Sequence, residues 1–504
     1  MSVEKAIAED GTTVEFRLTD EHASGAKKDV YWHPQNQYVV AIYKESRNEK
    51  QEKWLKDLIA KREKLYGGNS GEYWKDHVLD CWPEKSFQWN GKHGFVMPPC
   101  QSRYRFKEKP VGMDKDEKSV FAFQNLMINC LGMEEGRMVA TGVFDKLPAA
   151  ETGDLKGYVQ ACSEIARGVR WLNNSGLAHS DLSCNNVLVD PLTGRACIID
   201  LDGLVVPKTH EAEVSGTHGY VAPEIYHKTE PSKPCIETDL HSLAVLIYIL
   251  LFHRHPLLSK RLYVQQAKDG EIDYKKNIEM LCGQKALFVE HPTDKSHPCH
   301  ERQYEKQHWI DPQQTPYTIH GPHLRELFEK AFIDGLHKQK RRPTAGMWES
   351  ALLQTRDLLV PCGNDTCPKR WYVVYDTKHL KCPYCGTPYS GVLPVLDFFR
   401  KDGTLTGHRL NVHHNLCLRL WHAREDRRDS EQLPEDEREG SVGCFSLLNN
   451  QRWYLTNVAL NNMKNLTTGE YVPIDQSVEL RDGLELLFST SDTAQKARVR
   501  FVNR

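Results

Sequence analysis

A polar loop at residues 178–191 carries side chains that could serve as a general base and as ligands for a cation. The stretch AHSDLSCNNVLVDP places His179 two residues before Asp181 and Asn186 five residues after it. Nineteen residues beyond Asp181, the apolar run in IIDLDG ends at Asp200. A carboxylate can orient a hydroxyl and accept its proton, and carboxylate and amide oxygens are good Mg²⁺ ligands. The alternative is an ordinary turn, because Ser, Asp and Asn side chains bond to nearby backbone.

The elements around this loop are expected to change from strands to helices along the chain. Alternating apolar residues predict strands between residues 12 and 46, and a charged helix follows at about 48–66. The segment FQWNGKHGFVMP predicts a hairpin around Asn90-Gly91. Residues 154–176 then have the period of a helix. This order predicts an α+β fold with two lobes.

The composition limits the class of protein. A chain of 504 residues with 39% hydrophobic and 27% charged residues is expected to form two to four globular domains. Its net charge of −2 gives no general reason to expect nucleic acid as a partner. The N-terminus does not resemble a signal peptide, and the apolar run at 243–252 is too short to span a bilayer. Together with 15 cysteines, an odd number, these features predict a cytoplasmic protein with reduced thiols.

The loop and the segments in order around it resemble a protein kinase. AIYK at 41–44 is similar to the strand that presents the phosphate-binding lysine, and ASGAKKDV at 23–30 lies over the glycine-rich loop pattern. GTHGYVAPE at 216–224 resembles the end of an activation segment, and TDLHSLAVLIYILL resembles the buried helix that follows it. RRPTAGMWESAL resembles the closing helix of the domain. The resemblance implies the bilobal protein-kinase fold, ATP and Mg²⁺ as cofactors, and a protein substrate.

The resemblance also implies roles for individual residues. Lys44 would hold the α- and β-phosphates, Asp181 would orient the acceptor hydroxyl, and His179 would support the loop. Asn186 and Asp200 would bind Mg²⁺.

Other residues would surround the nucleotide or fix the loop. Gly25 and Val30 would cover it, and Met97, within the hinge segment 96–100, would line the adenine pocket. Asp239 would hold the catalytic loop, and Arg342 or Arg341 would pair with Glu224. Autophosphorylation is expected in the activation segment, at Thr209, Ser215, Thr217 or Tyr220.

Glu52 is the preferred partner for Lys44, although Glu63 and Glu72 stay open as alternatives. Glu52 and Glu63 are eleven residues apart and therefore lie on nearly the same face of a helix. Each of the three could equally be a solvated surface charge.

Several positions depart from the kinase pattern. Ser180 and Ser183 replace the usual arginine and lysine of the catalytic loop, and Asp202 replaces the glycine of the metal-binding loop. Asp202 could add a second carboxylate to the metal site or face solvent. These departures keep open two alternatives to an active protein kinase. The first is a nucleotide-binding pseudokinase scaffold, and the second is a kinase-fold enzyme that acts on a small molecule or transfers nucleotides to proteins.

Four cysteines form a second pattern with chemical meaning. Cys362 and Cys367 are separated by four residues, Cys382 and Cys385 by two, and fourteen residues lie between the pairs. Thiolates at this spacing predict a tetrahedral structural Zn²⁺. The alternative is four buried free thiols. Other histidines, at 297–300 and in GHRLNVHH at 407–414, are expected to lie on the surface.

The C-terminal part is expected to be an all-β sandwich. Its segments WYLTN, VELRDG and RVRFV resemble a forkhead-associated domain, without the arginine and Ser-x-x-His pair that read phosphothreonine. The expected domains are a kinase N-lobe (1–105), a C-lobe (106–358), a zinc ribbon (359–390) and the sandwich (391–504). This order resembles bacterial kinases of the tellurite-resistance, TerY-phosphatase-kinase operon type. That resemblance implies a phosphatase and a von Willebrand-type protein as partners, and a role in stress or defence.

Overall fold

Two compact units make up the computed structural model of the chain. The first unit comprises residues 1–153, 161–306 and 328–346, and the second comprises 154–160, 307–327 and 347–504. The structure describes residues 2–19, 22–25, 27–65, 77–100, 102–104, 132–134, 137–139, 152–207, 209–210, 216–226, 233–259, 283–299, 311–427, 440–449 and 451–502. Glu72 and Ser215, two residues of interest in the sequence, lie outside these ranges, and the structure says nothing of the Glu63 side chain.

The first unit begins with antiparallel strands. Strands β1 (Ser2–Ile7) and β2 (Thr13–Leu18) form a hairpin. A five-stranded sheet follows with the order β3-β4-β5-β7-β6. Its strands are β3 (Ala23–Ser24), β4 (Lys28–Trp32), β5 (Val39–Tyr43), β6 (Lys85–Trp89) and β7 (Lys92–Met97). The predicted turn at Asn90-Gly91 joins β6 to β7, and both residues have positive φ, 49° and 75°. An Asn-Gly pair suits this turn because both residues tolerate left-handed backbone.

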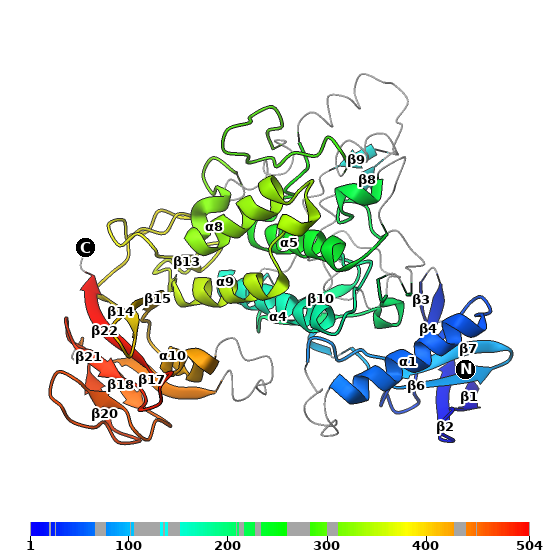
Figure 1. The fold of residues 1–504 in the computed structure, drawn as a ribbon, viewed down its shortest axis with the longest axis horizontal. Coiled ribbons are helices and arrows are strands. Elements are labelled where there is room, and N and C mark those ends of the chain that lie inside the picture. The colour runs from blue at the N-terminus through cyan, green and yellow to red at the C-terminus, as the bar shows by residue number, and fades with distance from the viewer. Residues whose placement is uncertain are drawn as a thin grey trace. The chain divides into compact units, whose positions relative to one another are not determined.

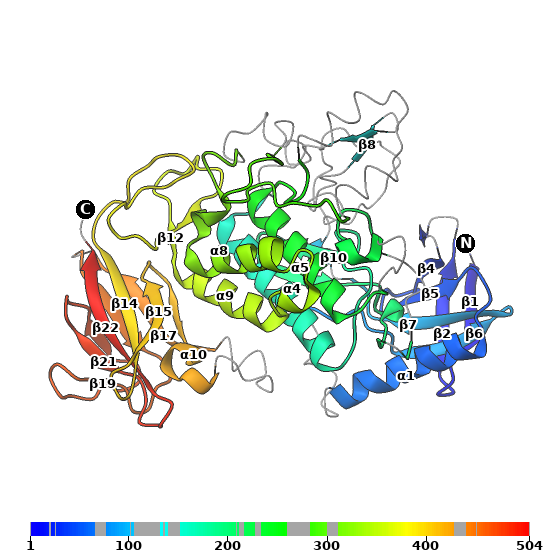
Figure 2. The ribbon, with the colours of Figure 1, turned by 45° about the horizontal axis from the view of Figure 1, so that its top comes forward.

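The two faces of the five-stranded sheet pack against different elements. Ala41 and Tyr43 of β5 form a buried cluster with Phe95 of β7 and Leu55 of helix α1 (Glu49–Leu65). Val40 and Ile42 pack on the opposite side with residues of β1 and β2. Figures 1 and 2 show α1 lying alongside this sheet. Because side chains alternate along a strand, a residue's parity decides which of these faces it joins.

Helices follow the five-stranded sheet along the chain, and several of them are divided between the two units. Helix α4 (Leu155–Asn174) has buried residues at Val159, Ile165, Val169 and Leu172, as its sequence period predicts. Gly176 follows it with φ 70°, which is the conformation that commonly ends a helix. Helix α5 (Ile236–Phe252) is buried from Thr238 to Phe252, which confirms that the apolar run at 243–252 is a core helix. Among the described residues, no helix is long and apolar enough to cross a membrane.

Short strands carry the loops between these helices. Strands β10 (Val187–Asp190) and β11 (Arg195–Ile198) form a hairpin between the two polar segments of interest. Strands β8 (Gly132–Glu134) and β9 (Arg137–Val139) form a separate pair. Helix α8 (Pro322–Glu329) continues into a π-helical turn at Lys330–Asp334, and helix α9 (Ala345–Asp357) follows.

The two larger sheets of the second unit are antiparallel and lie in its C-terminal part, which agrees with the prediction of an all-β region there. One sheet has the order β15-β14-β22-β21-β19 and the other β16-β17-β18-β20. The strands of the first are β14 (Leu393–Arg400), β15 (Leu405–Asn411), β19 (Lys464–Asn465), β21 (Glu485–Leu487) and β22 (Gln495–Val502). Those of the second are β16 (Cys417–Arg419), β17 (Ser441–Leu447), β18 (Trp453–Asn457) and β20 (Ser477–Glu479). Both sheets contribute to one buried core, which includes Phe398, Phe445 and Leu455.

Small elements complete the second unit. Helix α10 (Leu420–Ala423) is a single turn after β16, and β12 (Leu359–Pro361) pairs with β13 (Trp371–Val373). The core around β12 and β13 also includes Leu393 and Val395 of β14 and Val502 of β22. The cysteine-rich segment therefore shares its hydrophobic core with the larger sheet of the same unit.

Candidate active site

The loop at 178–186 is fixed by a buried carboxylate from α5. Asp239 accepts hydrogen bonds from the backbone N–H groups of His179, at 2.5 Å, and Ser180, at 3.1 Å. Burial raises the pKa of Asp239 to about 6, against the opposing effects of His179 and of these N–H groups. The His179 ring adds a bond of 2.8 Å from Nε2 to the carbonyl oxygen of Ile199, one residue before Asp200. The prediction that Asp239 anchors the loop is confirmed.

The Asp181 carboxylate is oriented from two sides. The Thr217 hydroxyl donates to its Oδ1 at 2.7 Å. The Asn186 side-chain N–H donates to Oδ2 at 3.1 Å and to the Asp181 carbonyl oxygen at 2.8 Å. Because the amide nitrogen of Asn186 is spent on these bonds, its amide oxygen is the atom left to ligate a cation. The structure thus brings Asp181 and Asn186 together, as the sequence spacing predicts.

Asp200 lies at the end of the β10–β11 hairpin in a left-handed conformation, with φ 64°. Its side chain is 40% exposed, and its Oδ1 accepts from the Lys28 ammonium. Lys28 also contacts Asp202, whose side chain is only 8% exposed. Burial raises the pKa of Asp200, but the charge of Lys28 outweighs this effect and the net pKa is lowered. Asp200 is therefore an ionised carboxylate that solvent can reach, which suits a metal ligand.

The sequence left open whether Asp202 joins the metal site or faces solvent. The structure excludes the second possibility, because the Asp202 side chain is nearly buried. Its second oxygen accepts a hydrogen bond of 2.7 Å from the Tyr43 hydroxyl. Asp202 thus connects the loop after β11 with the end of β5 and with Lys28 on β4.

Lys44 contacts a different part of the first unit from Asp200 and Asp202. Its Nζ donates to the Ser24 hydroxyl at 2.8 Å and to the Gly25 carbonyl oxygen at 2.7 Å, and it is 3.4 Å from Asp29. All three partners belong to the β3–β4 hairpin. The structure does not bring Lys44 to Asp200 within the described residues, and its assigned role in phosphate binding stays a prediction.

Glu52 is also away from its expected partner. Its carboxylate lies 2.8 Å from His93 Nε2, on β7. Among the described ion pairs, none joins Glu52 to Lys44.

The remaining nucleotide-site candidates surround the α1 face of the sheet. Val30 and Met97 are partly buried against the cluster of Ala41, Tyr43, Leu55 and Phe95. Gly25 closes the β3–β4 turn through an N–H bond of 2.9 Å to the Lys28 carbonyl oxygen. No contact tests their predicted role in ATP binding.

Outside the loop at 178–186, the predicted pairing of Arg342 with Glu224 is confirmed. Arg342 donates to both oxygens of Glu224, each at 2.7 Å, and both side chains are buried. Such a two-pronged pair fixes direction as well as distance. It holds the end of the activation-segment-like stretch in place.

A pocket opens directly beside Asp181. Its lining includes the polar residues Ser180, Asp181, Thr217, Tyr220, Thr238 and Ser242, together with apolar residues. The loop of Asp181, the 216–226 segment and the first turns of α5 thus enclose a small space, with room for about one water molecule.

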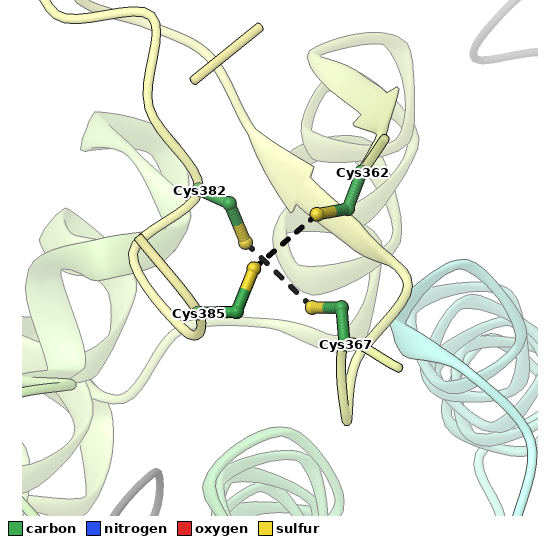
Figure 3. Close-up of side chains that lie close together, drawn as sticks. All are labelled: Cys362, Cys367, Cys382 and Cys385. Carbon is green, nitrogen blue, oxygen red and sulfur yellow. Dashed lines mark hydrogen bonds between the residues drawn. The ribbon is translucent and has the colours of Figure 1, made fainter. Parts of the chain in front are cut away.

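The four cysteines of the second unit converge as their spacing predicts. Figure 3 shows their side chains pointing toward one another, with Sγ separations of 3.4 Å for Cys362–Cys385 and 3.7 Å for Cys367–Cys382. The four Sγ atoms all lie within 4.8 Å of one another. Sulfurs about 2.3 Å from a central zinc in tetrahedral geometry stand roughly 3.8 Å apart, so the cluster fits Zn²⁺.

A buried polar cluster in the second unit overturns one expectation. His408, expected on a strand surface, is buried, and its Nε2 lies 2.7 Å from Asp357 Oδ2. His422 Nε2 lies 3.0 Å from the same oxygen. The sequence gives no local signal for this cluster, because Asp357 is 51 residues from His408.

The hydrogen bonds favour a structural role for this cluster over a metal site. The Arg419 backbone N–H donates to His422 Nδ1 at 2.8 Å. A neutral ring that accepts at Nδ1 carries its proton on Nε2, which donates to Asp357 and has no lone pair for a metal.

Comparison with known proteins agrees with the geometry of the loop around Asp181. Residues 133–330 match the family model described as the protein kinase domain. The match begins after the five-stranded sheet, so it covers the loop of Asp181 and the Asp200 segment but neither Lys28 nor Lys44. Residues 133–330 are therefore similar to protein kinase domains, which agrees with the resemblance drawn from the sequence.

Among the curated proteins to which the chain is similar are several protein kinases. The chain is 29% identical over 133 residues to serine/threonine-protein kinase 33 of Bos taurus, covering 23% of this chain and 26% of that protein. It is 27% identical over 139 residues to the calcium/calmodulin-dependent protein kinase type II of Caenorhabditis elegans, covering 26% and 19%. For the serine/threonine-protein kinase plk-2 of Caenorhabditis elegans, the figures are 32% over 100 residues, 20% and 15%. The chain thus spans about a quarter or less of the length of these relatives.

Proposed function

We propose that the chain is an ATP- and Mg²⁺-dependent protein kinase that phosphorylates Ser or Thr hydroxyls. The observation that carries the proposal is the Asp181 carboxylate, held by Thr217 and Asn186, together with a solvent-accessible Asp200. The residue before Asp200, Ile199, donates a backbone hydrogen bond of 2.9 Å to the Asn186 carbonyl oxygen, which ties the two segments together. These groups correspond to the base and the metal ligands that phosphoryl transfer needs.

Each group has a defined task in this proposal. ATP supplies the γ-phosphate, and Mg²⁺ neutralises charge on the phosphates. Asp181 accepts a hydrogen bond from the acceptor hydroxyl and takes its proton. The amide oxygen of Asn186 and the carboxylate of Asp200 hold the metal. His179 and Asp239 keep the loop backbone in place, so Asp181 needs no rearrangement before transfer.

The acceptor hydroxyl of the substrate is proposed to approach the Asp181 carboxylate. Thr217 already donates a hydroxyl hydrogen bond of 2.7 Å to Asp181 Oδ1, so this oxygen is able to accept from a Ser or Thr hydroxyl. Thr209 is exposed and is the favoured autophosphorylation site, whereas Tyr220 is buried.

We also propose a structural metal and a fold for the second unit. Cys362, Cys367, Cys382 and Cys385 hold a structural Zn²⁺, and the two sheets form a forkhead-associated-like sandwich. On the resemblance of the sequence to kinases of the tellurite-resistance type, we further propose a phosphatase and a von Willebrand-type protein as partners, and a role in stress or defence. A cytoplasmic location is proposed from the N-terminal sequence and the odd number of cysteines.

The test compares the wild type with Asp181→Asn, which keeps the shape of the side chain but removes the base. Both proteins are incubated with Mg²⁺, γ-labelled ATP and a mixture of Ser- and Thr-containing peptides, and the label is located by mass spectrometry. We expect the substitution to lower kcat by roughly 10²–10⁴-fold, the usual contribution of a general base. Equal unfolding temperatures serve as the control for folding.

Nucleotide binding without label transfer in the wild type would instead support a pseudokinase scaffold. Label on a small molecule alone would support the other alternative left open by the sequence.

A further inference from the structure

The lysine nearest the proposed metal ligand comes from β4 and not from the segment that resembles the phosphate-binding strand. The Lys28 ammonium contacts Asp200 and Asp202, and its side chain is 17% exposed. Lys44 contacts only the β3–β4 hairpin among the described residues and is 38% exposed.

Strand geometry explains why the two lysines differ. Lys28 pairs with Tyr43 across the β4–β5 ladder, so both side chains lie on the face that packs against α1. Phe95 of the same face lies under the Lys28 ammonium, 5.5 Å from the ring centre. Lys44 follows Tyr43 and has the parity of Ile42, which packs on the opposite face. A shift of one residue along a strand moves a side chain to the other face, so Lys44 cannot approach Asp200 without a change of register.

The groups around Lys28 also replace the expected lysine–glutamate pair. A lysine that binds phosphates needs a carboxylate to hold its long side chain in one position. Asp202 supplies it here, because it is nearly buried and its other oxygen is fixed by the Tyr43 hydroxyl. Asp200 remains the more exposed of the two carboxylates, at 40%, and is free to turn toward a metal.

We propose that Lys28, positioned by Asp202, is the residue that binds the ATP phosphates, and that Lys44 instead braces the β3–β4 turn. This inference rests on the proposed kinase function and names a binding residue that the family pattern assigns to another strand. Lys44 stabilises the turn through its contacts with Ser24, Gly25 and Asp29.

The experiment measures nucleotide binding and turnover separately. Affinity for the Mg²⁺ complex of a non-hydrolysable ATP analogue is measured by calorimetry for the wild type, Lys28→Met and Lys44→Met. Lys92→Met, an exposed lysine in the β6–β7 hairpin, is the matched control. Transfer of label to peptide is measured on the same preparations.

We expect Lys28→Met to weaken analogue binding at least tenfold and to lower kcat by on the order of 10²–10³-fold, as for loss of one charge-stabilising donor. The loss in Lys44→Met should be at least tenfold smaller in both measurements. A loss in Lys44→Met that equals or exceeds that in Lys28→Met would overturn the proposal.

Folding and function are separated by two further measurements. Lys28→Arg keeps a cation beside Asp200 and Asp202, so it protects the fold if Lys28→Met does not accumulate. The proposal requires this variant to bind the analogue more weakly than the wild type at an unchanged unfolding temperature. If the wild type binds the analogue but transfers no label, the kinase function fails, while the comparison of Lys28 with Lys44 still decides the present inference.

Discussion

Two carboxylate clusters of the molecule differ in how far solvent can reach them. Around Asp200, in the first unit, a lysine and a second carboxylate meet at a position that is 40% exposed. Around Asp357, in the second unit, two histidines converge on one oxygen, and the three side chains are only 4%, 2% and 1% exposed. The first cluster can exchange partners with a ligand from solvent, whereas the second has no access for one. Here we take a charged cluster as a candidate binding site where solvent reaches it, and as a structural element where it is buried.

The largest effect should come from removing the proposed Zn²⁺ of the four-cysteine cluster, which belongs to the second unit. Chelation of Zn²⁺, or Cys367→Ser, should destabilise the second unit by several kcal/mol, because metal binding and folding are coupled in small cysteine-rich elements. A loss of this size lowers the unfolding temperature by roughly 10 °C or more. Differential scanning calorimetry with metal analysis measures both quantities. Cys444→Ser, outside the cluster, is the control and should retain the metal.

A matched pair of substitutions tests the comparison directly. Asp357→Asn breaks a buried charged cluster and should cost about 3 kcal/mol of unfolding free energy. Asp200→Asn should change the unfolding free energy by less than about 1 kcal/mol, because the group is partly exposed, but should lower kcat by on the order of 10³-fold. Denaturant unfolding and label transfer, measured on both variants, give the two quantities. Similar stability losses in both would remove the distinction between the clusters.

The smallest predicted effect is a loss of folding stability of the second unit at acidic pH. Burial lowers the pKa of His413 to about 4, and burial also lowers the pKa of His422, although Asp357 opposes it. In the unfolded chain both rings bind protons near pH 6.5, so stability is present above that pH and decreases as the pH falls toward 4. At pH 5, His413 alone should cost about 2 kcal/mol relative to pH 7.5.

The buried carboxylate of Asp357 does not alter the pH range in which the histidines lower stability. Asp357 has a lowered pKa in the folded state, and its contribution is lost only below the unfolded value near 3.8. His413→Gln should flatten the loss of stability between pH 7.5 and 5, as measured by thermal unfolding of the second unit. An unchanged slope would mean that His413 titrates normally.

Features that depend on neighbouring residues were predictable from the sequence. The Asn90-Gly91 hairpin, helix α4 and the four-cysteine cluster follow from local spacing and turn chemistry. Asp181 and Asn186 were also assigned correctly as neighbours, because five residues of one loop hold them together.

Features that depend on distant residues were not predictable. The sequence contains Lys27, Lys28 and Lys44, but only strand register decides which of them faces Asp200, 172 residues beyond Lys28. Similarly, nothing in GHRLNVHH indicates that His408 is buried against Asp357. A sequence motif can indicate that a lysine lies close to the site. The register of the paired strands decides which face of the sheet that lysine occupies, and therefore whether it reaches Asp200.

The salt bridges of Lys28 have a consequence for chemical labelling. Burial lowers the pKa of this amine, but Asp202 and Asp200 outweigh that effect and the net pKa is raised. Acylating reagents react with the neutral amine, so Lys28 should be modified slowly while the more exposed Lys44 reacts first. A lysine-profiling experiment on this protein would therefore report the most reactive lysine of the sheet, and that lysine would not be the one beside the metal ligand.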